Sequence, residues 1–107
     1  DYATAVFQAF REVEITVREA AGLGPTEIGV PLMRKAFDKA RGPLADSSLP
    51  DGERDAMAHL FAGAIGLFKN PLSHREAPIT DPVEAVELVL FASHLLRIVT
   101  RQRHARG

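Results

Sequence analysis

Residues 2–21, YATAVFQAFREVEITVREAA, decide the fold class of this chain. Apolar residues recur in this stretch at alternating spacings of three and four, which places them on one face of a helix. The stripe consists of Ala3, Val6, Phe10, Val13, Val17 and Ala20, with Phe7 at its edge. The outer face is assigned to Arg11, Glu12, Glu14, Arg18 and Glu19. We predict a core-facing helix that ends at Gly22, although such a seam could instead pair with a second subunit.

Two more helical segments follow in the middle of the chain. The first begins near Val30-Pro31, because proline suits the first turn of a helix, and it ends at Gly42-Pro43. The next begins near Asp51, a residue type common at N-caps, and ends near Lys69. The apolar residues of both segments follow helical spacing, so we expect each to bury one face.

Gly63 and Gly66 lie inside the segment that begins near Asp51. A glycine inside a helix destabilises it by about 0.5–1 kcal/mol relative to alanine. The simplest compensation is the close approach of a neighbouring backbone, in the same chain or in a partner. We therefore expect close contacts at these glycines.

The last helical segment has the clearest start in the sequence. Asp81 is the expected N-cap and Pro82 the first helical residue, and the pattern runs to about Arg101. Little polar face remains through its middle, where the apolar residues are Val83, Val86, Val89, Leu90, Leu96 and Ile98. A helix that is apolar nearly all round is a central one. We expect it to be covered on both sides, by its own bundle or by a dimer partner.

These four segments define the predicted fold class, because no stretch has a convincing strand pattern. Four helices with short connections favour an all-α, up-and-down four-helix bundle. A length of 107 residues fits a single domain, here residues 1–107. Since the helical pattern begins directly after Asp1, we expect this domain to be the C-terminal part of a longer protein with an unknown N-terminal region.

The composition excludes several classes of function. Cysteine is absent, which rules out disulfides, thiolate metal sites and cysteine catalysis. No apolar run approaches the ~20 residues of a membrane span, so we expect no membrane partner and a cytoplasmic location. The net charge of −1 argues against a broad, non-specific nucleic-acid surface, and any phosphate contact must be local.

Positive charge without nearby acidic residues is concentrated in residues 97–107. It comes from Arg97, Arg101, Arg103, His104 and Arg106. We interpret this end of the chain as a solvated, frayed tail. A tail that contacts phosphate is the alternative.

Residues 68–75, FKNPLSHR, depart from the simple bundle pattern. Pro71 disfavours helical geometry at Asn70, and an asparagine followed by a proline is also a good N-cap and first position of a new helix. We therefore predict a short extra helical turn from Pro71 to about Glu76, between the third and fourth helices.

Lys69 and His74 give this connection its chemical interest. Free backbone N–H groups at a helix start, beside a lysine, can bind an anion such as phosphate. His74 can give and take protons near neutral pH. Together these are the minimum for cleaving RNA through its own 2′-hydroxyl, with no metal and no organic cofactor. A plain helix-helix connection is the alternative interpretation.

The sequence resembles the HEPN superfamily, specifically its Ymh-type hypothetical C-terminal domain, over most of the chain after Pro25. The resemblance is carried by residues 29–37, GVPLMRKAF, by residues 60–64 and 66–71 with His74, and by Asp81, Glu84, Ala85, Glu87, Ala92 and Ser93. Active members of the superfamily are metal-independent RNases that work as dimers, with two motifs facing one cleft. The resemblance therefore implies RNA as a partner and a homodimer.

The superfamily's hallmark is an arginine followed by a polar residue and, after four to six residues, a histidine. The resemblance places His74 at the histidine, Asn70 at the polar position and Lys69 where the arginine is expected. A lysine is a point charge on a flexible stem and lacks the planar fork of arginine, so we expect weaker catalysis. The implied function is a metal-independent endoribonuclease with a Lys-x4-His motif, in phage defence or a toxin-type system.

Two other interpretations stay open. A catalytically weak or inactive helical module for dimerisation or RNA binding would keep the same fold. A metal site is disfavoured, because no two histidines have a paired-ligand spacing such as His-x-x-x-His. His59 and His94 lie on helices beside apolar residues, and we interpret both as partly buried structural histidines.

Overall fold

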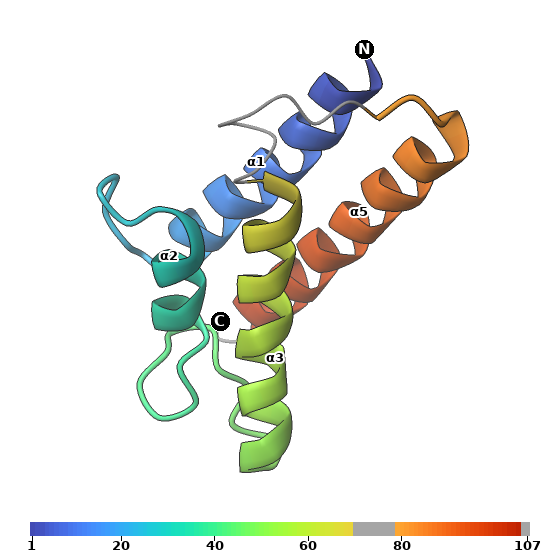
Figure 1. The fold of residues 1–107 in the computed structure, drawn as a ribbon. Coiled ribbons are helices and arrows are strands. Elements are labelled where there is room, and N and C mark those ends of the chain that lie inside the picture. Colours follow the sequence, from blue (N-terminus) through green and yellow to red (C-terminus); the bar gives the residue numbers. More distant parts are fainter. Residues whose placement is uncertain (70–78, 106–107) are drawn as a thin grey trace.

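The computed structural model describes residues 1–69 and 79–105, and its described part is helical without a strand (Figure 1). The helices are α1 (Tyr2–Ala20), α2 (Gly29–Ala36), α3 (Asp51–Ala64), the π-helical segment η1 (Ile65–Lys69) and α5 (Pro82–Ala105). They pack together as a bundle, in which α1 lies against α5 and α3 lies against α2. This confirms the predicted all-α fold class. The predicted helical turn at residues 71–76 lies outside the described residues.

Helix α1 is the centre of the bundle. It packs against α5 on one side and against α2 and η1 on the other. The predicted stripe is confirmed, since Val6, Phe10, Val13 and Val17 are fully buried. The Phe10 ring lies 5.2 Å from the ring of Phe68 on η1 and 6.0 Å from that of Phe91 on α5, measured between centroids. This aromatic cluster joins the three elements.

Helix α2 is shorter than predicted and ends at Ala36 rather than at Gly42. The side chain of Asp38 accepts hydrogen bonds from the backbone N–H groups of Ala40 and Arg41, at 3.2 and 2.9 Å. A short polar side chain that bonds nearby backbone offers the chain an alternative to the helix. Ala40, which lies inside the predicted helix, is therefore exposed in a turn.

Helix α3 begins one residue earlier than predicted. Asp51, the expected N-cap, is its first helical residue, and Pro50 occupies the cap position. The helix continues without interruption into η1, so described helical structure reaches Lys69 as predicted. A methyl group at Gly66 would lie 3.3 Å from Cγ2 of Val30, so the expected close contact exists there, with a side chain instead of a backbone. At Gly63, no described neighbouring atom would lie within 4 Å.

Helix α5 begins as predicted, with the side chain of Asp81 accepting a hydrogen bond from the N–H of Val83 at 2.9 Å. It runs to Ala105, one turn beyond the predicted end, so this part of the expected frayed tail is helical. Its buried face consists of Ala85, Ala92, Leu95 and Val99. Within the described chain α5 packs mainly on α1, so its own bundle covers only one side, and cover by a dimer partner stays a prediction. Among the described helices, none is long and apolar enough to cross a membrane.

Candidate functional site

Lys69 occupies the last described position of η1, at the end of the helix that leads into the predicted motif. Its side chain is 17% exposed, and its Nζ lies 3.3 Å from Oε1 of Glu14 on α1. Single π-helical turns within α-helices are uncommon and are frequent at functional sites. The side chain of the residue expected to contact phosphate is therefore largely buried and is paired with an internal carboxylate.

Glu14 is the one charged residue among the described positions that is buried, with 5% of its surface exposed. Its assignment to the solvated outer face of the first helix is wrong. Glu14 follows Phe10 by four residues and precedes Val17 by three, so it lies at the edge of the buried stripe. Because α1 is central and is covered by α2 and η1 on this side, that edge is inside the protein.

The second oxygen of Glu14 holds the start of α2. Its Oε2 accepts a hydrogen bond of 2.7 Å from the backbone N–H of Gly29. Gly29 has a φ of 65°, a conformation that residues with a Cβ rarely adopt. A carboxylate at a helix N-terminus satisfies a backbone donor that the helix leaves free and interacts favourably with the helix dipole. Glu14 thus connects α2 and η1 through α1.

The electrostatics of this cluster limit what Lys69 can do. A buried carboxylate requires a counter-charge or hydrogen bonds, and Glu14 has both. The pair is neutral as a whole, which weakens the attraction of Lys69 for an anion. An ammonium has three donors, however, and Glu14 is its one ion-pair partner among the described residues. Lys69 therefore keeps donors for a second partner while its flexible stem is restrained.

The other two residues of the predicted motif, Asn70 and His74, lie outside the described residues. The structure therefore brings Lys69 together with Glu14 and Gly29, two residues that the sequence interpretation did not assign to the site. A signal for Glu14 was present in its spacing from Phe10 and Val17. Its pairing with Lys69 has no sequence signal, because the two residues are far apart in the chain.

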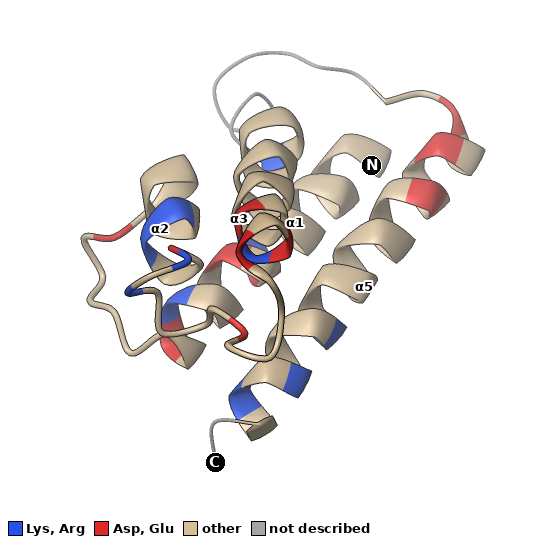
Figure 2. Ribbon diagram, turned by 90° about the horizontal axis from the view of Figure 1, so that it is seen from below, with Lys and Arg blue, Asp and Glu red and all other residues tan. Residues whose placement is uncertain are grey.

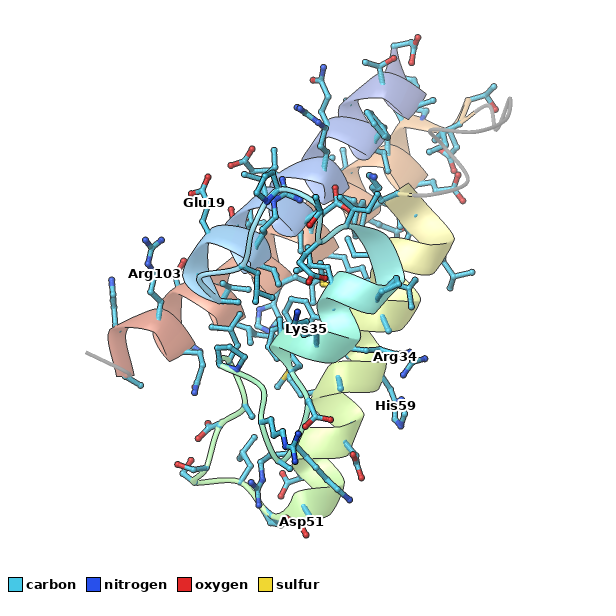
Figure 3. All side chains as sticks on the ribbon, turned by 90° about the vertical axis from the view of Figure 1, so that its left-hand side faces the viewer. Glu19, Arg34, Lys35, Asp51, His59 and Arg103 are labelled. Carbon is cyan, nitrogen blue, oxygen red and sulfur yellow. The ribbon has the colours of Figure 1, made fainter. Side chains whose placement is uncertain are left out.

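The described histidines outside the motif do not form a site. His59 and His94 are exposed, so their interpretation as partly buried structural residues is wrong. Figure 3 shows His59 projecting outward from α3. No group of three or more histidine, aspartate or glutamate side chains in residues 1–69 and 79–105 is arranged to hold a metal ion.

A hollow of about 280 Å³ opens elsewhere on the bundle, between α3, the α2–α3 connection and the last turns of α5. Its apolar floor includes Phe37, Leu44 and Met57, and Asp46 and Arg101 also line it. Met57 precedes Lys69 by twelve residues along α3 and η1, which corresponds to roughly 18 Å in an α-helix. The hollow and the Glu14–Lys69 cluster are therefore separate features.

Comparison with known proteins gives one family and no further relative. The model of a family described as "Protein of unknown function (Hypoth_ymh)" matches residues 1–99. No curated protein matches the chain. No solved structure matches it either. The matched region begins at residue 1 and so includes α1 with Glu14, whereas the sequence resemblance was placed after Pro25.

Proposed function

The chain belongs to the Hypoth_ymh family of unknown function, and from this premise we propose that it is a HEPN-like endoribonuclease that needs no metal ion. RNA is its proposed substrate, and the protein acts as a homodimer in phage defence or a toxin-type system. The motif is Lys69, Asn70 and His74. The chemistry uses the 2′-hydroxyl of the RNA as the nucleophile that attacks the adjacent phosphorus.

Each residue of the motif has a defined role in this proposal. His74 transfers a proton, as general base toward the 2′-hydroxyl or as general acid toward the leaving 5′-oxygen. Lys69 stabilises the negative charge that develops on the phosphate oxygens. Asn70 orients the reacting groups by hydrogen bonds. Arginine would bind the phosphate through two parallel hydrogen bonds, and lysine cannot.

The contact between Glu14 and Lys69 is the observation that supports this proposal most directly. A lysine can replace an arginine only if its flexible side chain is positioned by something else. The buried carboxylate of Glu14 restrains the ammonium at the end of η1, next to Asn70 in the chain. Glu14 is thus a positioning residue for Lys69, and this makes a Lys-x4-His motif workable where the superfamily uses arginine.

The same contact also favours a second candidate function, a catalytically inactive helical module for dimerisation or RNA binding. A neutral Glu14–Lys69 pair stabilises the junction of α1, α2 and η1 with no help from a substrate. In this alternative the pair is purely structural, and the fold serves association with RNA or with a second copy. The two candidates differ in whether the phosphodiester bond is broken.

Cleavage of a labelled single-stranded RNA in EDTA distinguishes the two candidates. The comparison uses the parent protein, His74→Ala, Lys69→Arg and Glu14→Gln, with His59→Ala as the matched control at an exposed histidine. We expect cleavage by the parent and by His59→Ala, loss of cleavage in His74→Ala, and faster cleavage by Lys69→Arg. Glu14→Gln should cleave more slowly than the parent, because the ammonium is no longer restrained by a charge.

Three outcomes bear on the choice. Cleavage that persists in His74→Ala contradicts the assignment of the motif. Cleavage by Lys69→Arg alone means that the native site is degraded. If no protein cleaves while circular dichroism shows that all remain folded, the inactive module is the better description.

A further inference from the structure

The hollow between α3, the α2–α3 connection and the last turns of α5 has an apolar floor and a charged rim. Phe37, Leu44 and Met57 belong to the floor, and Ile98 of α5 continues it. The volume of the hollow is about 280 Å³, whereas a cavity of about 150 Å³ is enough to hold benzene. The hollow therefore has room for an apolar group of the size of benzene together with a small polar group.

Hydrogen bonds hold the walls of the hollow in place. The side-chain Nε2 of Gln102 donates to the backbone carbonyl of Ala45 at 3.2 Å and so connects the end of α5 to the α2–α3 connection. Within that connection, the N–H of Leu44 donates to the carbonyl of Ala36 at 2.9 Å. Sites for small molecules are usually formed before the ligand binds, and walls that are fixed in this way meet that condition.

Two side chains of opposite charge line the hollow without contacting each other. Asp46 lies in the α2–α3 connection and Arg101 on α5, and the two form no ion pair. Figure 2 shows that the charged residues on the last turns of α5 are all basic, so Arg101 has no acidic neighbour on its own helix. Within residues 1–69 and 79–105, no group pairs with its guanidinium. Arg101 is therefore available to an anionic group in the hollow.

The carboxylate of Asp46 is only partly used by the protein. Its Oδ1 accepts hydrogen bonds from the N–H and the hydroxyl of Ser48, at 2.9 and 2.6 Å. The other oxygen, Oδ2, accepts no hydrogen bond from a described residue. Arg54 acts on Asp46 electrostatically, but its guanidinium already donates to the carbonyl of Lys39 and pairs with Asp51. Asp46 thus keeps an acceptor for a cationic group.

We propose that the hollow binds a free apolar α-amino acid, with its carboxylate on Arg101, its ammonium on Asp46 and its side chain on the apolar floor. A guanidinium binds a carboxylate through two parallel hydrogen bonds, and a carboxylate accepts strong, charge-assisted hydrogen bonds from an ammonium. An amino acid carries both charges close together and can bridge two opposite charges that the protein leaves unpaired. A simple anion would be repelled by Asp46, and a simple amine by Arg101.

The need for both charges distinguishes a free amino acid from a peptide. A residue inside a peptide carries neither charge, and a terminal residue carries only one of them. A ligand of about ten non-hydrogen atoms binds weakly, so we expect a dissociation constant of about 1 mM. The hollow is separate from the cluster of Glu14 and Lys69, so this inference goes beyond the proposed function and does not rest on RNA cleavage.

A titration followed by the NMR signals of the backbone amides tests the requirement for both charges. L-phenylalanine should bind at about millimolar concentration and shift the signals of Leu44, Ala45 and Gln102. Phenylpropionate lacks the ammonium and phenethylamine lacks the carboxylate, so each should bind at least about tenfold more weakly. The proposal is overturned if L-phenylalanine and L-leucine both fail to bind at about 10 mM, or if either analogue binds as well as L-phenylalanine.

Substitutions at the two charges test the site itself. Arg101→Gln and Asp46→Asn should each weaken the binding of L-phenylalanine about tenfold, because each removes one of the two charged partners. The matched control is Arg103→Gln, at an exposed arginine of α5 that does not line the hollow, and it should bind like the parent. Circular dichroism checks that each variant is folded during the titration. Unchanged binding in folded Arg101→Gln, or an equal loss in Arg103→Gln, contradicts the assignment.

Discussion

The Nζ of Lys69 and Oε1 of Glu14 lie 3.3 Å apart and connect the last turn of η1 to the middle of α1. The other oxygen of the same carboxylate holds the N–H of Gly29 at the start of α2. One buried side chain therefore fixes three elements relative to each other. The stability of the fold and the placement of the candidate catalytic cation depend on the same contact.

Removing the cation from this pair should destabilise the protein more than a surface substitution does. We expect Lys69→Met to lower the free energy of unfolding by about 2–4 kcal/mol, because it leaves a buried carboxylate with one hydrogen bond and no counter-charge. Urea denaturation measures this change. Glu12→Gln, at an exposed position of α1, serves as the control and should change the value by less than about 0.5 kcal/mol.

The coupling between the two charges can be measured directly by a double-mutant cycle. Glu14→Gln keeps an acceptor for Gly29 and removes the charge, so it isolates the ionic part of the cluster. Lys69→Met combined with Glu14→Gln should be less destabilising than the sum of the two single changes. If the two effects simply add, the charges do not interact in solution and the positioning role of Glu14 is wrong.

Gly29→Ala should be destabilising although the added group is only a methyl. The φ of 65° at Gly29 is a left-handed conformation, which costs an L-residue about 1–2 kcal/mol. We expect a loss of this size in urea denaturation. Gly24→Ala is the matched control in the connection before α2, where a methyl group would meet no described atom within 4 Å and φ is not positive. Equal effects at both glycines would contradict the strain argument.

The two glycines inside the third helical segment should respond differently to alanine. Gly63→Ala should raise the free energy of unfolding by about 0.5–1 kcal/mol, because alanine favours helix and the methyl group meets no described atom within 4 Å. Gly66→Ala should raise the free energy of unfolding by less, since its methyl group would lie only 3.3 Å from Cγ2 of Val30. Thermal denaturation of the two variants tests this order, and a larger gain at Gly66 would contradict it.

Asp46 should stabilise the fold at neutral pH, and this stabilisation should be lost in acid. Hydrogen bonds from the side chain and the backbone N–H of Ser48 lower the pKa of Asp46 below its usual value of 3.8. Because the folded-state pKa is lower than the unfolded one, this stabilisation is complete above the unfolded pKa and is lost as pH falls through the folded pKa. Asp46→Asn should therefore be less stable than the parent at pH 7, and the difference should shrink below about pH 4. A difference that is constant with pH would exclude this role.

The fold class was predictable because helical periodicity is carried by local sequence. The stripe from Val6 to Val17 needs no information about neighbours, and it is buried as expected. The early end of α2 was harder to predict, because it depends on the carboxylate of Asp38 bonding two backbone groups ahead of it. Whether a side chain competes with the helix for backbone N–H groups depends on local geometry, which cannot be predicted from the pattern of apolar residues.

The candidate site could be predicted only in part. Pro71 predicts that the helix ends near Lys69, and in the structure the described helix reaches Lys69. The partner of Lys69 could not be identified, because Glu14 is one of several acidic residues on α1 and only the packing of η1 and α2 selects it. The exposed face of α5 could not be assigned a neighbour for a related reason, since apolar residues all round a helix do not tell whether its own bundle or a partner covers it.

Because η1 is π-helical, the number of residues in this segment determines the direction in which Lys69 points. A π-helical turn contains about one residue more than an α-helical turn, because its hydrogen bonds span five residues. Deleting one residue from Ile65–Lys69 would restore the α-helical register and turn Lys69 by about 100° around the axis, away from Glu14. The extra residue of this π-helical turn therefore orients the side chain of Lys69 toward the buried charge of Glu14.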